Sequence, residues 1–235
     1  SLHNHVFRNG HSDLALYRTI MLGIPGTPMV ARNLSRDDGW RLVSYLNRIL
    51  ILTNLSAPSA STWSGEPFQP VTASELRGAN DRPAEWLTYS GSYTAQRHSR
   101  LDRINRDNVG QIRVEWERQL STTYIQGEGR GLESSPIVRG STMFVTQDSS
   151  VLALDAVTGH VIWTYSRNLP QSALCCSEYA FNRGVALLGS QIFVGTLDAH
   201  LIALDASTGA VNWDFAIAER GSITGAPLAI DDMVI

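Results

Sequence analysis

Apolar and polar residues follow two different patterns along the chain, and each pattern predicts a different kind of structure. Near the N-terminus, Trp40, Val43, Leu46 and Leu50 recur three or four residues apart, the spacing that places side chains on one face of a helix. In the second half, short runs alternate between apolar and polar positions, as strands with one buried face do. The patterns therefore predict helices before about residue 55 and short β-strands from Trp86 onward.

The second predicted helix begins at a recognisable cap. Ser35 precedes the apolar pattern and Asp38 lies three residues further on, a variant of the capping box that satisfies free amides in a first helical turn. Residues 56–84 are rich in Ser, Ala and Pro, a composition typical of linkers. We therefore expect a helical region over 1–55, a linker over 56–84 and a β region over 85–235.

The β region contains an internal repeat of about 50 residues. Segments 153–163 and 203–213 share Ala, Leu, Asp, Ala, Thr, Gly, Val and Trp at corresponding positions. In each segment we expect the Asp to bond amides of the following turn, the Gly to supply a positive φ, and the Trp to pack against a neighbour. Several short strands per repeat are typical of propeller blades, and about 150 residues hold at most three blades. A two-hairpin sheet of another β fold is the alternative.

Charge and residue usage exclude several classes of function. The chain carries 19 basic and 22 acidic residues, a net charge of −3, which argues against an electrostatic nucleic-acid binder. The sequence contains no Lys, so a P-loop lysine and a Schiff-base lysine are excluded. The longest apolar run, 49–52, is far too short for a transmembrane segment, and no signal peptide is visible. Because the sequence opens at Ser1 and stops at Ile235 inside a strand-like run, we expect a fragment.

Several shorter motifs accompany the repeat in a fixed order. They are Trp86-Leu-Thr-Tyr-Ser-Gly-Ser-Tyr-Thr, Leu101-Asp-Arg-Ile-Asn-Arg-Asp-Asn-Val, Glu133-Ser-Ser-Pro-Ile-Val, Cys175-Cys176, Asn182-Arg183-Gly184 and Thr196-Leu-Asp-Ala-His-Leu-Ile-Ala-Leu-Asp. With the repeat Ala-x-Asp-x-x-Thr-Gly-x-x-x-Trp, they resemble the quinoprotein alcohol dehydrogenases, eight-bladed propellers that carry pyrroloquinoline quinone (PQQ). The resemblance implies a mostly β fold over residues 86–235, with about three blades of a partial eight-bladed β-propeller.

Three residues near the starts of expected strands are candidates for binding PQQ. From the residues alone, Glu133 is an exposed strand-end carboxylate, Arg183 a surface arginine and Thr224 an ordinary strand threonine. The resemblance implies that Glu133 bonds a quinone or carboxylate group of PQQ, Arg183 its quinone oxygens and Thr224 a carboxylate. Such contacts suit a tricarboxylate, which needs donors and cations around it, and a guanidinium stabilises charge that develops on reduction.

Cys175 and Cys176 are the chain's two cysteines and are adjacent in the sequence. Neighbouring Cα atoms lie about 3.8 Å apart across a trans peptide, below the roughly 4.4–6.8 Å of an ordinary disulfide, so geometry favours two buried thiols. The resemblance implies instead a vicinal disulfide that stacks on one face of the quinone. It also implies an oxidising compartment.

The turn-rich run Gly23-Ile-Pro-Gly-Thr-Pro-Met29 and the helical pattern over 34–50 resemble the C-terminal part of a class I c-type cytochrome domain. A lone methionine is usually core filler. The resemblance implies that Met29 is an axial ligand of haem iron, and Met/His ligation raises the haem potential, which suits an electron acceptor. The attachment sequence C-x-x-C-H is absent, and we expect it upstream of Ser1.

Together the resemblances imply part of a periplasmic quinohaemoprotein that oxidises an alcohol to an aldehyde or ketone by hydride transfer to PQQ. Electrons then pass to haem c and on to a cytochrome or quinone acceptor. The catalytic aspartate and most ligands of a Ca²⁺ or lanthanide ion are expected beyond Ile235, so we expect residues 1–235 alone to be inactive. A non-catalytic propeller scaffold of the cell envelope is the alternative, but a scaffold has no reason to combine Glu133, Cys175, Cys176, Arg183 and Thr224.

Overall fold

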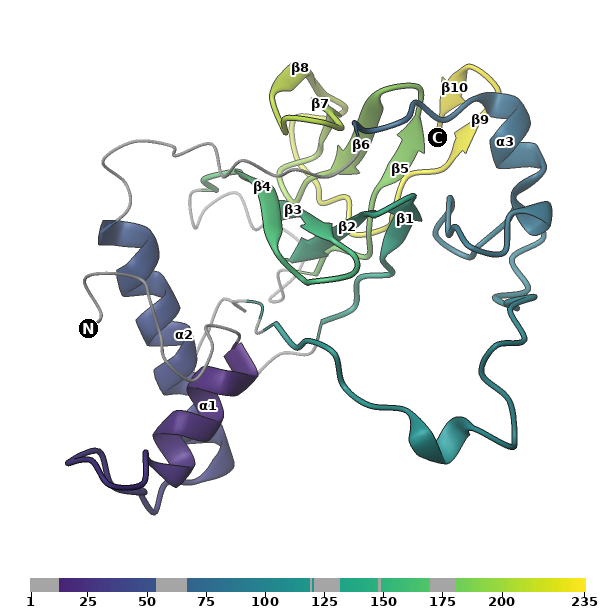
Figure 1. Ribbon diagram of the computed structural model, residues 1–235. Coiled ribbons are helices and arrows are strands. Elements are labelled where there is room, and N and C mark those ends of the chain that lie inside the picture. The colour runs from purple at the N-terminus through teal and green to yellow at the C-terminus, as the bar shows by residue number, and fades with distance from the viewer. Residues whose placement is uncertain (1–12, 54–66, 119, 121–131, 148, 170–180) are drawn as a thin grey trace. The chain divides into compact units, whose positions relative to one another are not determined.

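The computed structural model describes residues 13–53, 67–118, 120, 132–147, 149–169 and 181–235, without the side chains of 47–53. The chain divides into two compact units, Ser1–Trp63 with Arg113–Ser121 and Ser64–Ile112 with Thr122–Ile235. Helices α1 and α2 belong to the first unit, and all the strands belong to the second (Figure 1).

The helical unit contains α1 (Asp13–Leu22) and α2 (Arg36–Thr53). The predicted cap of α2 is confirmed. The Asp38 amide donates to the Ser35 hydroxyl at 3.1 Å, and that hydroxyl donates to the Asp38 carboxylate at 2.7 Å. The reciprocal bonds explain why the helix begins directly after Ser35, because they satisfy groups that the first turn would otherwise leave unpaired.

A small apolar core joins these two helices, and its buried members are Leu16, Ile20 and Val43. Beside this core the Tyr17 ring stacks on Trp40, with ring centroids 4.4 Å apart. Gly39 makes this approach possible, because a Cβ at that position would lie 2.6 Å from the Tyr17 ring. The helical spacing of Trp40, Val43 and Leu46 therefore corresponds to a packing face, while the Leu50 side chain lies outside the described residues.

The β unit contains two four-stranded antiparallel sheets whose strands follow one another in sequence order. The first consists of β1 (Ile137–Arg139), β2 (Thr142–Gln147), β3 (Ser150–Asp155) and β4 (Val161–Ser166). The second consists of β5 (Ala186–Leu188), β6 (Gln191–Gly195), β7 (His200–Asp205) and β8 (Val211–Ala216). A third, two-stranded sheet pairs β9 (Ala229–Ile230) with β10 (Met233–Val234).

The two larger sheets share their register as well as their order. Ile137 pairs with Phe144 in the first sheet, and Ala186 pairs with Phe193 in the second. Each sheet has a register shift at the same place in its third strand, directly after Ala153 and directly after Ala203. The sequence repeat is therefore a structural repeat, and the sheets resemble propeller blades, as predicted.

The turn between the third and fourth strands is built as the sequence predicted. The Asp155 carboxylate accepts the amides of the second and third residues after it at 2.9 and 2.7 Å, and the Asp205 carboxylate does the same at 3.0 and 2.9 Å. Gly159 and Gly209 follow with φ of 69° and 72°. An aspartate that bonds its own turn and a glycine at positive φ fix the reversal locally.

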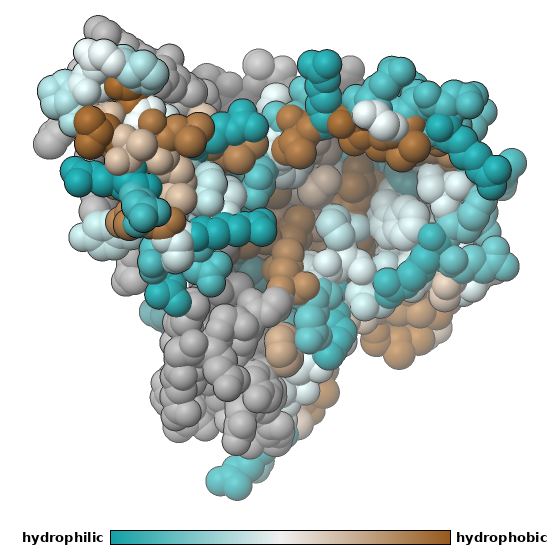
Figure 2. All heavy atoms as spheres, turned by 90° about the horizontal axis from the view of Figure 1, so that it is seen from below, coloured by the Kyte–Doolittle hydropathy of each residue, from teal (hydrophilic) through white to brown (hydrophobic). Residues whose placement is uncertain are grey.

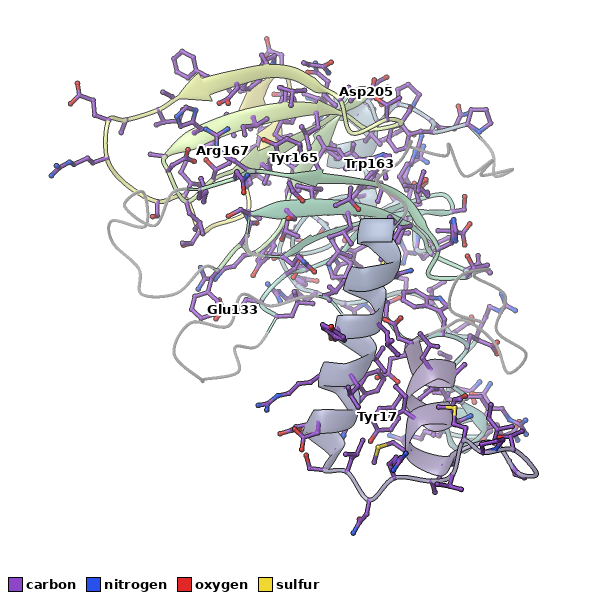
Figure 3. The ribbon with its side chains drawn as sticks, turned by 90° about the vertical axis from the view of Figure 1, so that its left-hand side faces the viewer. Tyr17, Glu133, Trp163, Tyr165, Arg167 and Asp205 are labelled. Carbon is purple, nitrogen blue, oxygen red and sulfur yellow. The ribbon has the colours of Figure 1, made fainter. Side chains whose placement is uncertain are left out.

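The two larger sheets contact each other through the tryptophan of β4. The Trp163 indole nitrogen donates to the Ala206 carbonyl at 3.0 Å, and the ring lies so close to Gly209 that a Cβ there would be 2.5 Å away. Figure 3 shows Trp163 beside the turn that carries Asp205. The expectation that this tryptophan packs against a neighbour is confirmed for the first sheet.

Residues 67–84, within the stretch expected to be a linker, pack as part of the β unit. They form α3 (Ala73–Arg77) and the 3₁₀ turn η2 (Ala79–Asp81). The Val71 and Gly189 backbones exchange two hydrogen bonds, and the Val71 and Leu76 side chains are buried in the main core. Composition alone misses this because isolated apolar residues in a Pro-rich run become core residues only when a sheet lies beside them.

Residues 86–118 contain no multi-residue strand in the structure, although strands were expected from Trp86 onward. Trp86 forms an isolated bridge to Val138, and η3 (Val109–Gln111) is a single 3₁₀ turn. Leu101 and Ile104 are more than half exposed. Exposed apolar residues are common in this protein, and Figure 2 shows them among hydrophilic ones on the face seen from below. Side-chain bonds from Asn105 and Asn108 to nearby backbone groups stabilise turns here instead.

Candidate cofactor site

Three of the candidate residues lie on segments that lead into the first strand of a sheet. Glu133 precedes β1, Arg183 precedes β5 and Thr224 precedes β9. Backbone hydrogen bonds join the three segments, because the Ser135 amide donates to the Arg183 carbonyl at 3.0 Å and the Arg183 amide donates to the Thr224 carbonyl at 3.1 Å. Residues up to 91 positions apart in the sequence (133 to 224) are therefore neighbours in the structure.

The Arg183 side chain is the centre of this group. One of its terminal nitrogens lies 2.7 Å from a carboxylate oxygen of Glu133, and the other donates to the Thr224 carbonyl at 3.5 Å. The side chains of Arg183 and Glu133 are 38% and 36% exposed, so solvent or a ligand can reach both. The structure thus brings Glu133, Arg183 and Thr224 together.

Buried polar residues behind the group fix its backbone. The Thr146 hydroxyl is fully buried and donates to the Asn182 carbonyl at 3.2 Å, and its amide donates to the Ser134 hydroxyl at 3.0 Å. The Asn182 side chain accepts the Gly184 amide at 3.0 Å and donates to the Gly195 carbonyl at 2.8 Å. Because buried hydrogen bonds are costly to break, they hold Arg183 from both sides.

An aromatic side chain lies near the Arg183 segment. Gly184 has a φ of 143°, and a Cβ there would lie 3.2 Å from the Ser135 carbonyl oxygen and 3.7 Å from the Tyr89 ring. The Arg97 guanidinium lies over the Tyr89 ring, 4.8 Å from its centroid, a cation–π arrangement. The positive φ and these close neighbours therefore favour a glycine at position 184.

The remaining candidate residues are not part of this group in the described structure. Cys175 and Cys176 lie outside the described residues. Met29 belongs to the helical unit and closes a turn in which its carbonyl accepts the Ile24 amide at 2.8 Å and its amide donates to the Thr27 hydroxyl at 3.2 Å. The Met29 side chain is 43% exposed.

Sequence reasoning missed several residues that build the group. Thr146 reads as one polar position in an alternating strand, and Ser134 and Tyr89 lie in motifs without an assigned role. The sequence offered one weak indication of the role of Thr146. This threonine interrupts the apolar run of 142–147, and in the structure it is 0% exposed. Only the paired strands reveal that this threonine faces Asn182 and Ser134.

Among the described residues, no group of three or more His, Cys, Asp or Glu side chains is arranged to hold a metal ion. No helix in the described part of the chain is both long enough and apolar enough to cross a bilayer.

Comparison with known proteins identifies the family. Residues 86–224 match the sequence model of the PQQ-type glucose/ethanol/alcohol dehydrogenase β-propeller domain, which is more than half of the chain. The chain belongs to this family. The matched region contains both four-stranded sheets together with Glu133, Arg183 and Thr224.

Individual relatives agree with this assignment. The dehydrogenase subunit of the quinone-dependent alcohol dehydrogenase of Komagataeibacter europaeus is 37% identical over 143 residues, which are 59% of this chain and 18% of that protein. Quinohemoprotein alcohol dehydrogenase ADH IIB of Pseudomonas putida is 34% identical over 197 residues, which are 81% of this chain and 27% of that protein. The chain thus spans less than a third of the length of these relatives.

Solved structures give the same result. Quinohemoprotein alcohol dehydrogenase ADHIIG of Pseudomonas putida HK5 superposes with a TM-score of 0.63 at 33% identity, covering 72% of this chain and 25% of that one. The quinohemoprotein alcohol dehydrogenase of Comamonas testosteroni superposes with a TM-score of 0.58 at 34% identity, covering 69% and 26%. The β unit therefore has the fold of part of a quinoprotein propeller.

Proposed function

We propose that this chain supplies one wall of the PQQ pocket in a periplasmic alcohol dehydrogenase whose propeller is completed by further blades. The proposed enzyme oxidises an alcohol to an aldehyde or ketone and passes electrons through haem c to a cytochrome or quinone acceptor. The observation that carries the proposal is the convergence of Glu133, Arg183 and Thr224 from the starts of three successive sheets. Family membership over residues 86–224 supports the choice of cofactor.

The donor set of this group fits a quinone that carries three carboxylates. A guanidinium has five N–H groups, and the contacts with Glu133 and the Thr224 carbonyl engage only part of that capacity. The partial exposure of the Arg183 and Glu133 side chains leaves them reachable. Both are mounted on backbone that buried hydrogen bonds hold in place, and such rigidity favours tight binding.

Each of these residues has a distinct role in the proposed enzyme. Arg183 binds an anionic oxygen and keeps a positive charge beside it, while Glu133 orients Arg183 through their ion pair. Thr224 offers a hydroxyl to a carboxylate, and Cys175 with Cys176 covers one face of the ring. PQQ, when bound, supplies the carbonyl that accepts a hydride, with a Ca²⁺ or lanthanide ion as Lewis acid held by residues of later blades.

We further propose that the helical unit is part of a c-type cytochrome in which the Met29 sulfur binds haem iron. An exposed thioether on a turn closed by backbone bonds suits this role. Replacing Met29 with His removes the thioether ligand and should lower the haem midpoint potential, because a thioether ligand raises it. Redox titration of the haem-loaded protein measures this, with Met143→Leu in β2 as the control; an unchanged potential in Met29→His would contradict the proposal.

Binding of PQQ to the complete apo-protein tests the proposed site. Arg183→Gln should weaken PQQ binding by about 10- to 100-fold, since a charge-assisted hydrogen bond contributes roughly 1.5–3 kcal/mol. Quenching of intrinsic tryptophan fluorescence during PQQ titration gives the dissociation constant. Arg103→Gln, in an exposed turn, is the matched control and should bind like the unaltered protein. Equal binding by Arg183→Gln and the control would overturn the proposal.

Two measurements on the complete protein distinguish the proposed enzyme from an envelope scaffold: the oxidation state of the two cysteines and PQQ-dependent activity. A non-reducing mass spectrum of the purified protein should show a mass about two daltons below that of the dithiol if Cys175 and Cys176 are bridged. PQQ-dependent reduction of a dye by an alcohol should accompany the bridge. Free thiols together with no PQQ binding would favour the scaffold.

A further inference from the structure

One turn supports both of the segments that carry Arg183 and Thr224. It comprises residues 195–198, from the last residue of β6 into the connection to β7, and we call it the scaffold turn. Three consecutive carbonyls of the turn accept hydrogen bonds: that of Gly195 from the Asn182 side chain at 2.8 Å, the next from the Ile223 amide at 2.9 Å, and the third from the Ser222 hydroxyl at 2.8 Å. Asn182 directly precedes Arg183, and Ile223 directly precedes Thr224, so a shift of this turn shifts both.

The scaffold turn is itself held by an arginine of the other sheet. Arg167 directly follows β4, and its guanidinium and Nε make three contacts of 2.8–3.0 Å with the Asp198 carboxylate at the end of the turn. The third guanidinium nitrogen lies 2.7 Å from the Asp214 carboxylate on β8. Figure 3 shows Arg167 near the end of its strand, with Trp163 further along the same strand. Arg167 thus joins the first sheet to two places in the second.

The contacts of Arg167 with Asp198 and Asp214, which we call the clamp, are partly buried. The side chains of Arg167 and Asp198 are 17% and 20% exposed, and the Thr196 hydroxyl also donates to Asp198. Burial works against the charge on Asp198, but the hydrogen bonds from Arg167 and Thr196 outweigh it and lower the pKa of this carboxyl. His200 contacts Asp214 from β7. The carboxylates therefore stay ionised and keep Arg167 in place.

We propose that Arg167 is a positioning residue for the cofactor site, acting through Asp198 and the scaffold turn on Arg183 and Thr224. The inference rests on the proposed function, because it assumes that these two residues bind the cofactor. It also makes a claim that needs no cofactor: breaking the clamp should loosen the backbone of both segments in the apo-protein. A residue that only stabilised the contact between two sheets would not selectively change the mobility of these two segments.

A second arginine provides the matched control. Arg139 ends β1, is 11% exposed in its side chain and pairs with Glu75 and Glu85 at 3.0 and 2.9 Å. It has as many ion-pair partners as Arg167 and is buried to a similar degree. None of its hydrogen bonds reaches the scaffold turn. Arg139→Gln therefore removes a comparable ion pair elsewhere in the same sheet.

Amide hydrogen exchange of the complete apo-protein tests the positioning directly. Arg167→Gln should speed exchange of the Arg183 and Ile223 amides about tenfold, because these amides donate to the Thr224 and Thr196 carbonyls. Arg139→Gln should leave both unchanged. Unchanged exchange in Arg167→Gln, or an equal increase in Arg139→Gln, would overturn the inference. Asp198→Asn keeps the shape of the clamp and should show the same increase if Arg167→Gln fails to fold.

PQQ titration of the same variants separates this inference from the proposed function. Arg167→Gln should weaken PQQ binding about tenfold, as the loss of a second layer of support around a bound group commonly does, and Arg139→Gln should not. Arg167→Lys keeps the charge but loses the fork, so its affinity should fall in between. If the unaltered protein binds no PQQ, the proposed function fails while the exchange result still decides on positioning. If it binds PQQ and Arg167→Gln binds equally well, the inference fails alone.

Discussion

The two tryptophans of the repeat have the same surroundings within their own sheets but not between sheets. Trp163 lies 6.0 Å from Phe144, centroid to centroid, and Trp213 lies 5.8 Å from Phe193, with similar tilts of 40° and 45°. Yet Trp163 is 9% exposed and Trp213 is 39% exposed. The difference corresponds to the Ala206 carbonyl and the Gly209 turn, which receive the Trp163 indole.

Some features of the repeat form within one sheet, whereas burial of its tryptophan requires a neighbouring sheet. The order of the strands, the register shift in the third strand and the aspartate turn are the same in the two sheets. Burial of the tryptophan depends on a turn that belongs to the next repeat. Each repeat can therefore form its local structure, while its stability depends on the sheet that follows, as in other repeat architectures.

The largest difference is expected from removing each tryptophan. Trp163→Ala should lower the free energy of unfolding by about 3–5 kcal/mol, because it deletes a buried aromatic side chain. In residues 1–235, Trp213→Ala should cost only about 1 kcal/mol, since Trp213 is 39% exposed in this part of the proposed propeller. Urea unfolding of the two variants measures both values. Equal losses would mean that the neighbouring turn contributes little.

A slightly smaller effect is expected from the turn that receives Trp163. Gly209→Ala should cost about 2–4 kcal/mol, because it combines a strained positive φ with a Cβ only 2.5 Å from a carbon of the Trp163 indole. Gly140→Ala is the control, since its φ is 56° but a Cβ there meets nothing within 4 Å, and it should cost only about 1 kcal/mol. The same urea titrations measure both losses. The difference between them is the free energy lost because the new Cβ obstructs the Trp163 indole.

The aspartate turns should behave alike in the two sheets. Asp155→Ala and Asp205→Ala each remove a carboxylate that accepts two amides and a threonine hydroxyl. Because both turns are exposed, each loss should be about 1 kcal/mol. Thermal unfolding of the pair checks this, and a difference much larger than the error of measurement would contradict the view that local structure is independent of the neighbour.

The smallest effect concerns pH and the clamp between the sheets. Hydrogen bonds from Arg167 lower the pKa of Asp198 and Asp214 below the ordinary value of 3.8, against the effect of their burial. A lowered folded pKa contributes stability that is present above the unfolded pKa and is lost as pH falls through the folded pKa. The free energy of unfolding should therefore decrease below about pH 4. Urea titrations between pH 6 and 3 should show that the free energy of unfolding decreases less steeply in Arg167→Gln. An identical pH dependence would exclude the clamp as a source of this loss of stability.

Much of the local structure could be predicted from the sequence because it depends on residues close together in the chain. The cap at Ser35 involves a residue three positions away, and the turns at Asp155 and Asp205 involve the next four residues. The repeat is visible in the sequence, and it predicted sheets like the two four-stranded ones. Strands were also expected between Trp86 and residue 118, but the structure has no multi-residue strand there, since alternation alone does not supply a partner strand.

The candidate site was only partly accessible to sequence reasoning. The motifs that resemble the quinoprotein family pointed to Glu133, Arg183 and Thr224, but nothing in their spacing states that an ion pair joins the first two. Arg167 was not singled out at all, because its partners Asp198 and Asp214 lie 31 and 47 residues further along the chain.

The sequence by itself determined the caps, the turns, the repeat and the family resemblance, because each of these depends on residue identities at short and regular spacing. The tertiary structure decided which repeated residues are buried, which three strand starts meet at one place, and which arginine contacts the scaffold turn beside two of them. Hydrogen bonds and packing between distant segments follow from the way sheets stack. Similar local sequences, such as those around Trp163 and Trp213, therefore differ in exposure within residues 1–235 when different segments lie beside them.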